Sequence, residues 1–105
     1  MADKPPQSGL CVVFARVVAH EGKADQLEAL ITEAIKSARS DKEPYTLTYR
    51  CARNGDEFRL FEEYDQDNQG GIKSHMAQEP FQNLMKSGLA KETEIKFFQE
   101  VAAKL

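Results

Sequence analysis

The segment from Leu10 to Ala19, LCVVFARVVA, limits what this chain can fold into more than any other. Its residues are apolar at both odd and even positions, many are β-branched, and Arg16 is the one charged residue. A strand exposed on one face alternates apolar and polar residues, whereas a strand covered on both faces does not. The segment therefore predicts a strand at the centre of a sheet, and the remainder of the chain must supply its neighbours and its cover.

A helix and a hairpin follow this strand. Residues 23–39 place apolar side chains at helical spacing, namely Leu27, Leu30, Ile31, Ala34, Ile35 and Ala38. The helix ends in SDKEP, because Pro44 cannot continue it. Asn54-Gly55 is a strong hairpin signal between residues 45–53 and 57–64. Alternation predicts that Tyr45, Leu47, Tyr49 and Cys51 share one face of the first arm, and that Phe58, Leu60, Glu62 and Tyr64 share one face of the second.

Two short helices and a last strand complete the pattern. Residues 67–77 predict a helix that Asp67 or Asn68 caps, with Ile72 and Met76 on its inner face. Pro80 suits the first turn of another helix, with Phe81, Leu84 and Met85 inward. Residues 93–102 predict a strand, with Ile95, Phe97 and Val101 on one side.

The order strand, helix, strand, strand, helix, strand is that of the ferredoxin-like split βαβ arrangement, an α+β fold. It predicts a four-stranded antiparallel sheet in the order 4-1-3-2 with the helices on one face. We expect a single domain over residues 9–105 and a disordered leader over residues 1–8, which carry Pro5 and Pro6. The other face of the sheet keeps large apolar groups, so we expect a homodimer in which two sheets pack face to face.

Composition excludes several classes of function. Fourteen basic and 17 acidic residues give a net charge of -3, which argues against a nucleic-acid-binding protein. The chain has no long apolar run, which argues against a membrane protein, and its first residues have no apolar segment of a signal peptide. Two cysteines without a CxxC motif fit a reducing, cytoplasmic compartment. Two histidines and scattered carboxylates form no convincing metal site.

Four residues are candidates for acid–base or binding roles. His75 can take or give a proton near pH 7, or it can be a surface or capping histidine. Tyr49 and Tyr64 can direct hydroxyls into an apolar cavity, or they can be core tyrosines whose hydroxyls are satisfied at its rim. Glu62 lies among apolar residues, where an unpaired carboxylate is costly. It is either a general base or orienting group, or one half of a structural ion pair with an arginine or a histidine.

Arg16 is a further candidate, a strand arginine like Arg50 and Arg59. It can bind an anionic or phenolate oxygen, or it can pair with Glu57, Glu62 or Glu63 across strands.

A short pattern resembles a known family. Phe61-Glu62-Glu63-Tyr64, followed by His75-Met76 and then Pro80-Phe81, is similar to the antibiotic biosynthesis monooxygenase domain and to the related quinol monooxygenases. The similarity extends over about residues 10–102 and implies a dimeric α+β barrel. Tyr64 stands where a Trp is usual in that family, and Pro80 stands where a second histidine is common. The chain has no Trp and has Met85 at the position of a haem ligand, which argues against haem cleavage.

The resemblance implies a cofactor-independent monooxygenase that oxidises a small electron-rich aromatic, a hydroquinone or polyketide phenol, with O₂ and without flavin, haem or metal. In that interpretation His75 is the base or orienting group, Tyr49 and Tyr64 donate hydroxyls, Arg16 stabilises an anion, and Glu62 orients one of these. The alternative is a non-catalytic dimeric ligand-binding or stress-response protein of the same barrel type, which the missing second histidine favours. Isomerisation or dehydration of a small cyclic substrate would use the same residues.

Overall fold

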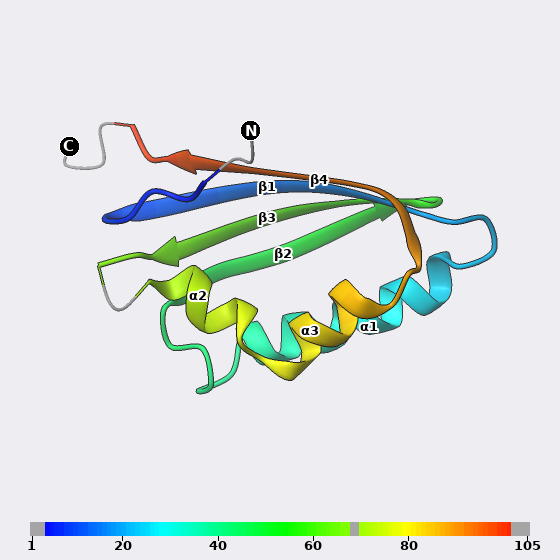
Figure 1. Cartoon of the computed structure of the whole chain (residues 1–105), viewed down its shortest axis with the longest axis horizontal. Coiled ribbons are helices and arrows are strands. Elements are labelled where there is room, and N and C mark those ends of the chain that lie inside the picture. Colours follow the sequence, from blue (N-terminus) through cyan, green and yellow to red (C-terminus); the bar gives the residue numbers. More distant parts are fainter. Residues whose placement is uncertain (1–3, 68–69, 102–105) are drawn as a thin grey trace.

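The computed structural model describes residues 4–67 and 70–101 and confirms the expected α+β fold. Four antiparallel strands form one sheet in the order β2-β3-β1-β4, which is the predicted order read from the other edge. All three helices lie against one face of the sheet (Figure 1). The elements are β1 (Leu10–Ala19), α1 (Ala24–Ala38), β2 (Thr46–Asn54), β3 (Glu57–Asp65), α2 (Gly71–Met76), α3 (Glu79–Lys86) and β4 (Ala90–Gln99).

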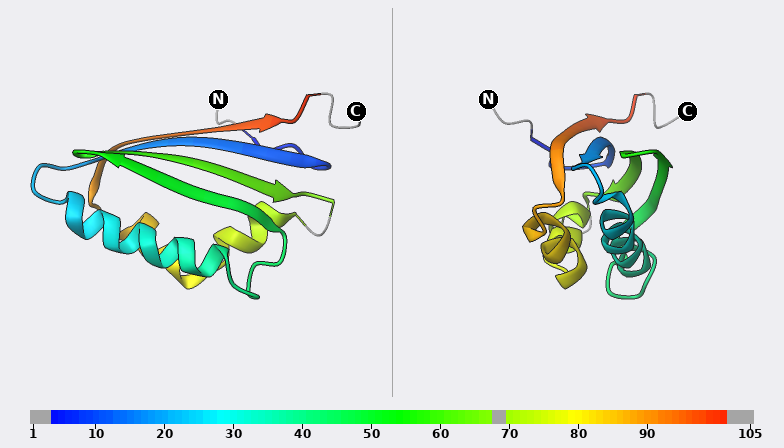
Figure 2. Two further views of the ribbon diagram at one scale, coloured as in Figure 1. Left: turned by 180° about the vertical axis from the view of Figure 1, so that it is seen from behind. Right: turned by 90° about the vertical axis from the view of Figure 1, so that its right-hand side faces the viewer.

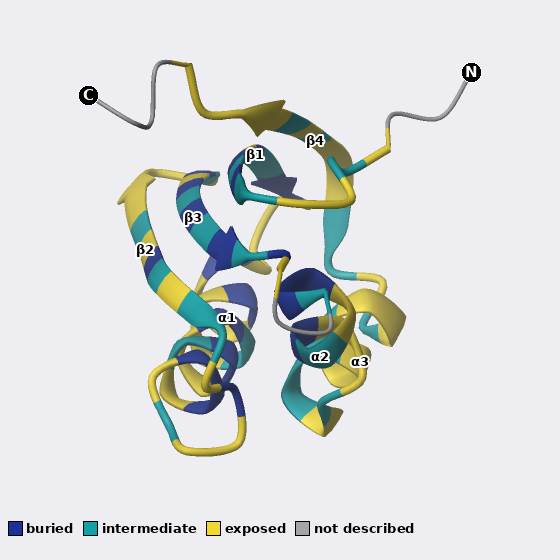
Figure 3. Ribbon diagram, turned by 90° about the vertical axis from the view of Figure 1, so that its left-hand side faces the viewer, coloured by how far each residue is buried: buried dark blue, intermediate teal, exposed yellow. Residues whose placement is uncertain are grey.

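The core lies between the sheet and the helices. Strand β1 is central and pairs with both β3 and β4, as its apolar sequence predicts. Its odd-numbered residues Cys11, Val13 and Ala15 are buried, and the inner side of α1 is closed by Leu27 and Ile31. Figure 3 shows buried residues on β1 and β3 of the sheet and on α1 and α2. Burial of this stripe on α1 stabilises the helix more than its intrinsic propensity does.

Helices α1 and α3 lie side by side beneath the sheet (Figure 2). Helix α1 contacts β1 and β2, whereas α3 packs mainly on α1 and has no fully buried residue. Helix α3 therefore covers the sheet without filling all of the space between itself and the strands.

Strand β2 differs from the prediction at its start. The register of β2 with β3 shifts between Thr46 and Thr48, so the strict alternation expected for this strand is broken. Leu47, predicted to face inward, is 57% exposed. The side chain of Thr46, which strict alternation would place on the face opposite to Tyr49, instead reaches Glu43 in the loop that precedes the strand. Because of this irregularity, the hydroxyl of Thr46 lies beside Glu43, whereas the apolar side chain of Leu47 is exposed.

Both short helices bury less than the sequence predicts, and α2 also begins later. Helix α2 starts at Gly71, and the Asp67 carboxylate accepts a hydrogen bond from the Gly9 N–H instead of capping it. The other predicted cap, Asn68, lies outside the described residues. Met76 and Met85, predicted inward, are 44% and 53% exposed. A helix this short turns only a narrow stripe toward the core, and in α2 Ile72 and His75 occupy it.

The last strand also ends earlier than the sequence predicts. Strand β4 ends at Gln99 because Gln99 pairs with Cys11, close to where the partner strand β1 begins. Val101 is therefore outside the strand and 89% exposed, and the predicted end at Ala102 lies outside the described residues. Within the leader expected over residues 1–8, the Pro6 carbonyl accepts a hydrogen bond from the Gln66 side chain at 2.8 Å. Residues 1–3 lie outside the described part of the chain.

We expect Gly71→Ala to destabilise the fold by about 1–3 kcal/mol, because the start of α2 has no room for a side chain. A Cβ at Gly71 would lie 2.7 Å from the Tyr45 carbonyl oxygen and 3.0 Å from that of Asp65, and neither backbone atom can easily move. Urea unfolding measures the effect. Lys73→Ala, an exposed change on the same helix, is the control and should be nearly neutral; equal stability of the two variants would contradict the prediction.

Candidate functional site

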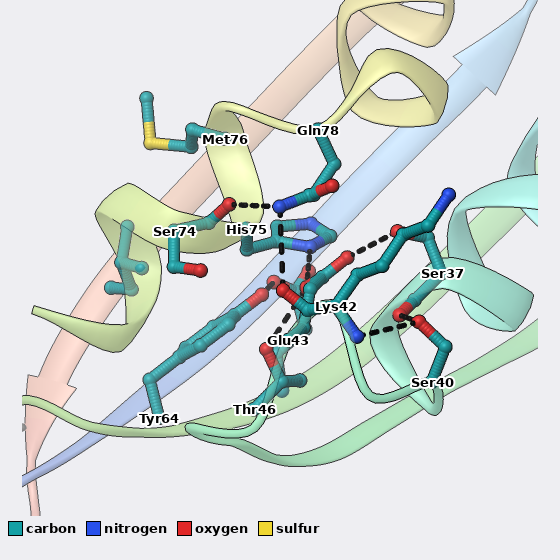
Figure 4. A network of polar contacts seen from close by, with 12 residues as sticks. Ser37, Ser40, Lys42, Glu43, Thr46, Tyr64, Ser74, His75, Met76 and Gln78 are labelled. Atoms are coloured by element: carbon teal, nitrogen blue, oxygen red, sulfur yellow. Dashed lines mark hydrogen bonds and ion pairs between the residues drawn. The ribbon is translucent and has the colours of Figure 1, made fainter.

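A buried contact between a histidine and a glutamate joins α2 to the loop that follows α1. His75, in the last turn of α2, is 3% exposed, and its Nδ1 lies 2.6 Å from Oε1 of Glu43. Figure 4 shows the Glu43 carboxylate between His75 on one side and Ser37 and Thr46 on the other. Ser37 Oγ donates to Oε2 at 2.6 Å, and Thr46 Oγ1 donates to Oε1 at 3.0 Å. Both carboxylate oxygens are therefore satisfied in the interior.

Glu43 carries its charge in this environment. Burial by itself would raise the pKa of the carboxyl, but the hydrogen bonds from His75, Ser37 and Thr46 outweigh burial, and the pKa lies below its ordinary value of 4.5. An ionised carboxylate only accepts hydrogen bonds, so Nδ1 of His75 carries the proton in this pair. In a neutral imidazole held in this way, Nε2 is the basic nitrogen.

Nε2 of His75 is buried and has no hydrogen-bond partner among the described residues. Three aromatic rings surround the imidazole. Its ring centroid lies 4.8 Å from that of Tyr49, 5.6 Å from that of Tyr64 and 5.1 Å from that of Phe81. A buried polar atom without a partner is uncommon in a folded protein and is typical of a functional site.

A second buried carboxylate lies beside this histidine. Glu62 on β3 is 8% exposed, and its Oε1 accepts a hydrogen bond of 2.5 Å from the Tyr64 hydroxyl. Burial raises the pKa of Glu62, although the hydrogen bond from Tyr64 and the nearby His75 oppose that effect. Burial and the adjacent Glu62 also raise the pKa values of Tyr49 and Tyr64, so both tyrosine hydroxyls remain protonated and available as donors.

A cavity of about 170 Å³ lies between the sheet and the helices, with Tyr49 and Glu62 in its wall. These two residues are directly opposite each other on β2 and β3. The remaining wall is mostly apolar and comes from the sheet, α1, α3 and the start of β4: Ala15, Val17, Leu27, Ile31, Leu60, Phe81, Leu84, Met85, Ser87, Gly88, Ala90, Thr93 and Ile95. His75 and Tyr64 are outside this wall and contact the residues that form it.

The structure therefore brings together four of the five predicted site residues. Tyr49, Glu62, Tyr64 and His75 form one group on the face that the helices cover. The ion pair considered for Glu62 with an arginine is not formed among the described residues, where its hydrogen-bond partner is Tyr64.

Arg16 lies apart from this group, on the opposite face of the sheet. Its guanidinium contacts Glu57 at 3.2 Å and Glu92 at 3.0 Å. The contact of Arg16 with Glu57 is the cross-strand pair that the sequence left open as an alternative. Glu92 on β4 is a second partner.

Three further residues of the site escape the sequence reading. Glu43 lies in the SDKEP segment, which indicates only the end of a helix, and Thr46 belongs to the irregular start of β2. The one available signal is Ser37, a hydroxyl residue beside the apolar stripe of α1 that the structure buries at 9% exposure. A buried serine indicates a nearby polar partner without identifying it.

The described residues contain no group of three or more His, Cys, Asp or Glu side chains placed to hold a metal ion. Within the same residues, no helix is both long enough and apolar enough to cross a membrane.

Comparison with solved structures identifies the fold. A protein from Pseudomonas aeruginosa matches with a TM-score of 0.78 and 20% identity, over 92% of this chain and 99% of its own. A protein from Caulobacter crescentus, provisionally named an antibiotic biosynthesis monooxygenase, matches with a TM-score of 0.76 and 20% identity, over 90% of this chain and 92% of its own. The chain has the fold of proteins given that name. The resemblance noted in the sequence to antibiotic biosynthesis monooxygenases is thus confirmed at the level of the fold.

The likeness to the antibiotic biosynthesis monooxygenase structures extends to further organisms. A protein from Deinococcus radiodurans with the same provisional name matches with a TM-score of 0.74 and 18% identity, over 89% of this chain and 94% of its own. No protein-family model and no curated protein sequence matches the chain. At these identities the shared feature is the architecture, and activity has to be argued from the site itself.

Proposed function

We propose that this protein is a cofactor-independent monooxygenase that oxidises a small electron-rich aromatic with O₂. The observation that carries the proposal is the cavity between the sheet and the helices, whose largely apolar wall includes the buried carboxylate residue Glu62 and, opposite it, Tyr49. Such a site binds an aromatic ring through its apolar walls and orients a hydroxyl through its few polar groups.

Glu62 is the group best placed to accept the substrate proton. It belongs to the cavity wall, and its raised pKa makes it a stronger base than an exposed carboxylate once it is ionised. Removal of a phenolic proton leaves a phenolate, which gives up electrons to O₂ far more readily than the phenol does. In the simplest balanced case one phenol and one O₂ yield one quinone and one water, so the substrate supplies every electron.

Tyr49, Tyr64 and His75 support this step from the same face. Tyr49 belongs to the cavity wall, and its hydroxyl is proposed to donate to the phenolate oxygen, whereas Tyr64 donates to Glu62 and holds its carboxylate. The nearby His75 also acts to lower the pKa of Glu62, which opposes the effect of burial. Glu43 keeps the imidazole in place through the contact with Nδ1.

Oxygen uptake by the purified protein, with a panel of phenols, catechols and hydroquinones, tests the proposal. We expect uptake above the rate of the uncatalysed reaction for at least one of them, with a quinone as the product. Saturable binding of these compounds without oxygen uptake would contradict it and would favour the non-catalytic ligand-binding alternative.

We also propose that the open face of the sheet is covered by a second copy of the chain. Phe14 and Phe98 are 51% and 46% exposed there, and Phe14 packs at 5.3 Å from Phe61 and 5.5 Å from Phe98 between ring centroids. Arginine, lysine and glutamate side chains surround this aromatic centre. An apolar patch edged by both signs of charge is suited to a two-fold interface with itself.

Sedimentation equilibrium at micromolar concentration should show a dimer, and Phe14→Asp should shift it to a monomer. The aspartate would place a charge in the apolar centre of the interface, where its burial is costly. Met76→Asp, an exposed change on α2, is the control and should leave the dimer intact. A folded wild-type monomer, or a Phe14→Asp protein that remains dimeric, would contradict the proposed interface.

A further inference from the structure

The size of the cavity restricts the ligand more narrowly than the proposed function does. Its volume is about 170 Å³, whereas sites for drug-sized ligands occupy about 300–1,000 Å³. An engineered apolar cavity of about 150 Å³ accommodates benzene. The cavity between the sheet and the helices is therefore matched to one aromatic ring with small substituents, and a fused second ring needs more room than this cavity offers.

Helix α3 sets this limit on the size of the ligand. On the sheet side, the wall includes the small residues Ala15 and Ala90. On the opposite side, Phe81, Leu84 and Met85 project from α3, which packs on α1 and holds these side chains over the sheet. Shortening a side chain of α3 is thus the change that enlarges the cavity without altering the core of the sheet.

The charges of the wall select against ionised ligands. Its residues include no lysine, arginine or histidine, and Glu62 is its carboxylate. Arg16, the predicted anion partner, lies on the other face of the sheet, paired with Glu57. An anionic substituent would therefore be buried without a counter-charge and beside a carboxylate, which is costly. A neutral hydroxyl, by contrast, can donate to Glu62 and accept from Tyr49.

We propose that the cavity selects uncharged, single-ring hydroxyaromatic compounds and that the side chains of α3 exclude fused-ring ones. The inference rests on the proposed function for the kind of chemistry, and it narrows the hydroquinone or polyketide phenol expected from the sequence to a monocyclic phenol. Selection by ligand size and by ligand charge is a property of binding to the cavity, so it is measured without turnover.

Binding of three probes to the full chain tests this selection: 4-methylphenol, 2-naphthol and 4-hydroxybenzoate. Titrations followed by amide chemical shifts locate each probe and give its dissociation constant. We expect 4-methylphenol to shift the amides of Leu84 and Ile95, and both other probes to bind at least about tenfold more weakly. An unrestricted apolar surface would give the reverse order for 2-naphthol, because the larger ring buries more apolar area. Tighter binding of 2-naphthol or of 4-hydroxybenzoate would overturn the proposal.

A matched pair of methionine variants assigns the limit to α3. Met85 belongs to the cavity wall, whereas Met76 on α2 does not, and both are partly exposed. We expect Met85→Ala to strengthen 2-naphthol binding about tenfold while Met76→Ala leaves it unchanged. Equal responses of the two variants would overturn the role of α3. Oxygen uptake is measured separately: selective binding without uptake would contradict the monooxygenase proposal and leave the size selection standing.

Discussion

Replacing Glu43 with alanine is expected to lower the free energy of unfolding by about 3–5 kcal/mol at pH 7, the largest stability effect we expect of a single substitution in this chain. Its side chain is fully buried and joins α1, β2 and α2 through Ser37, Thr46 and His75. Alanine leaves two hydroxyls and an imidazole N–H in the interior with nothing to accept from them. Urea unfolding measures the loss.

Two variants control this prediction. Glu43→Gln keeps an acceptor oxygen and should fall between the wild type and Glu43→Ala, and Glu33→Ala, an exposed change on α1, should be nearly neutral. Because the folded-state pKa of Glu43 is lowered, its ionisation contributes stability above its ordinary pKa of 4.5 and loses it as the pH falls through the folded-state value. The difference between the wild type and Glu43→Ala should therefore shrink below about pH 4.5. A difference under about 1 kcal/mol at pH 7 would contradict the structural role.

Glu62→Gln is expected to reduce the rate of oxygen uptake by about 10²–10⁴-fold, because the amide has nearly the shape of the carboxyl and cannot accept the substrate proton. Glu63→Gln is the matched control, since the next residue of β3 turns its side chain to the other face of the sheet. We expect the control to keep nearly full activity. Equal losses in both variants, or no loss in Glu62→Gln, would remove Glu62 from the mechanism.

The effect of Glu62→Gln on stability should depend on pH in the opposite direction to that of Glu43→Ala. A carboxyl whose folded-state pKa is raised contributes stability below its ordinary pKa of 4.5, and that contribution is lost as the pH rises through the folded-state value. Relative to the wild type, Glu62→Gln should therefore be more stable at pH 7 than at pH 4. A residue kept at a cost in stability is typical of a functional site.

The fold could be predicted because its signals are local. The two-sided apolar strand at Leu10–Ala19, the stripe of α1 and the Asn54-Gly55 turn each follow from neighbouring residues, and together they fix the strand order. Strand alternation likewise placed Glu62 and Tyr64 on the face that the helices cover. Neither Met76 nor Met85 could be placed in this way, because helices as short as α2 and α3 have too few residues for their period to define a face.

The candidate site could be predicted only in part because its polar contacts join distant segments. Glu43 and His75 are 32 positions apart, and a loop residue has no periodicity that indicates where its side chain points. The irregular register of β2 that turns Thr46 toward Glu43 depends on pairing with β3 and leaves no mark in the alternation. Arg16 is ambiguous for the same reason, since a strand arginine fits an anion site and a cross-strand pair equally well.

A crystal structure of the protein with 4-methylphenol bound would show where the aromatic ring and its hydroxyl are held, on which both the proposed reaction and the proposed selection depend. We predict a single ring between α3 and the sheet, with its hydroxyl oxygen within hydrogen-bond distance of Glu62 and Tyr49. A ring found instead on the open face, against Phe14 and Phe98, or a hydroxyl that contacts neither residue in an occupied cavity, would contradict the account.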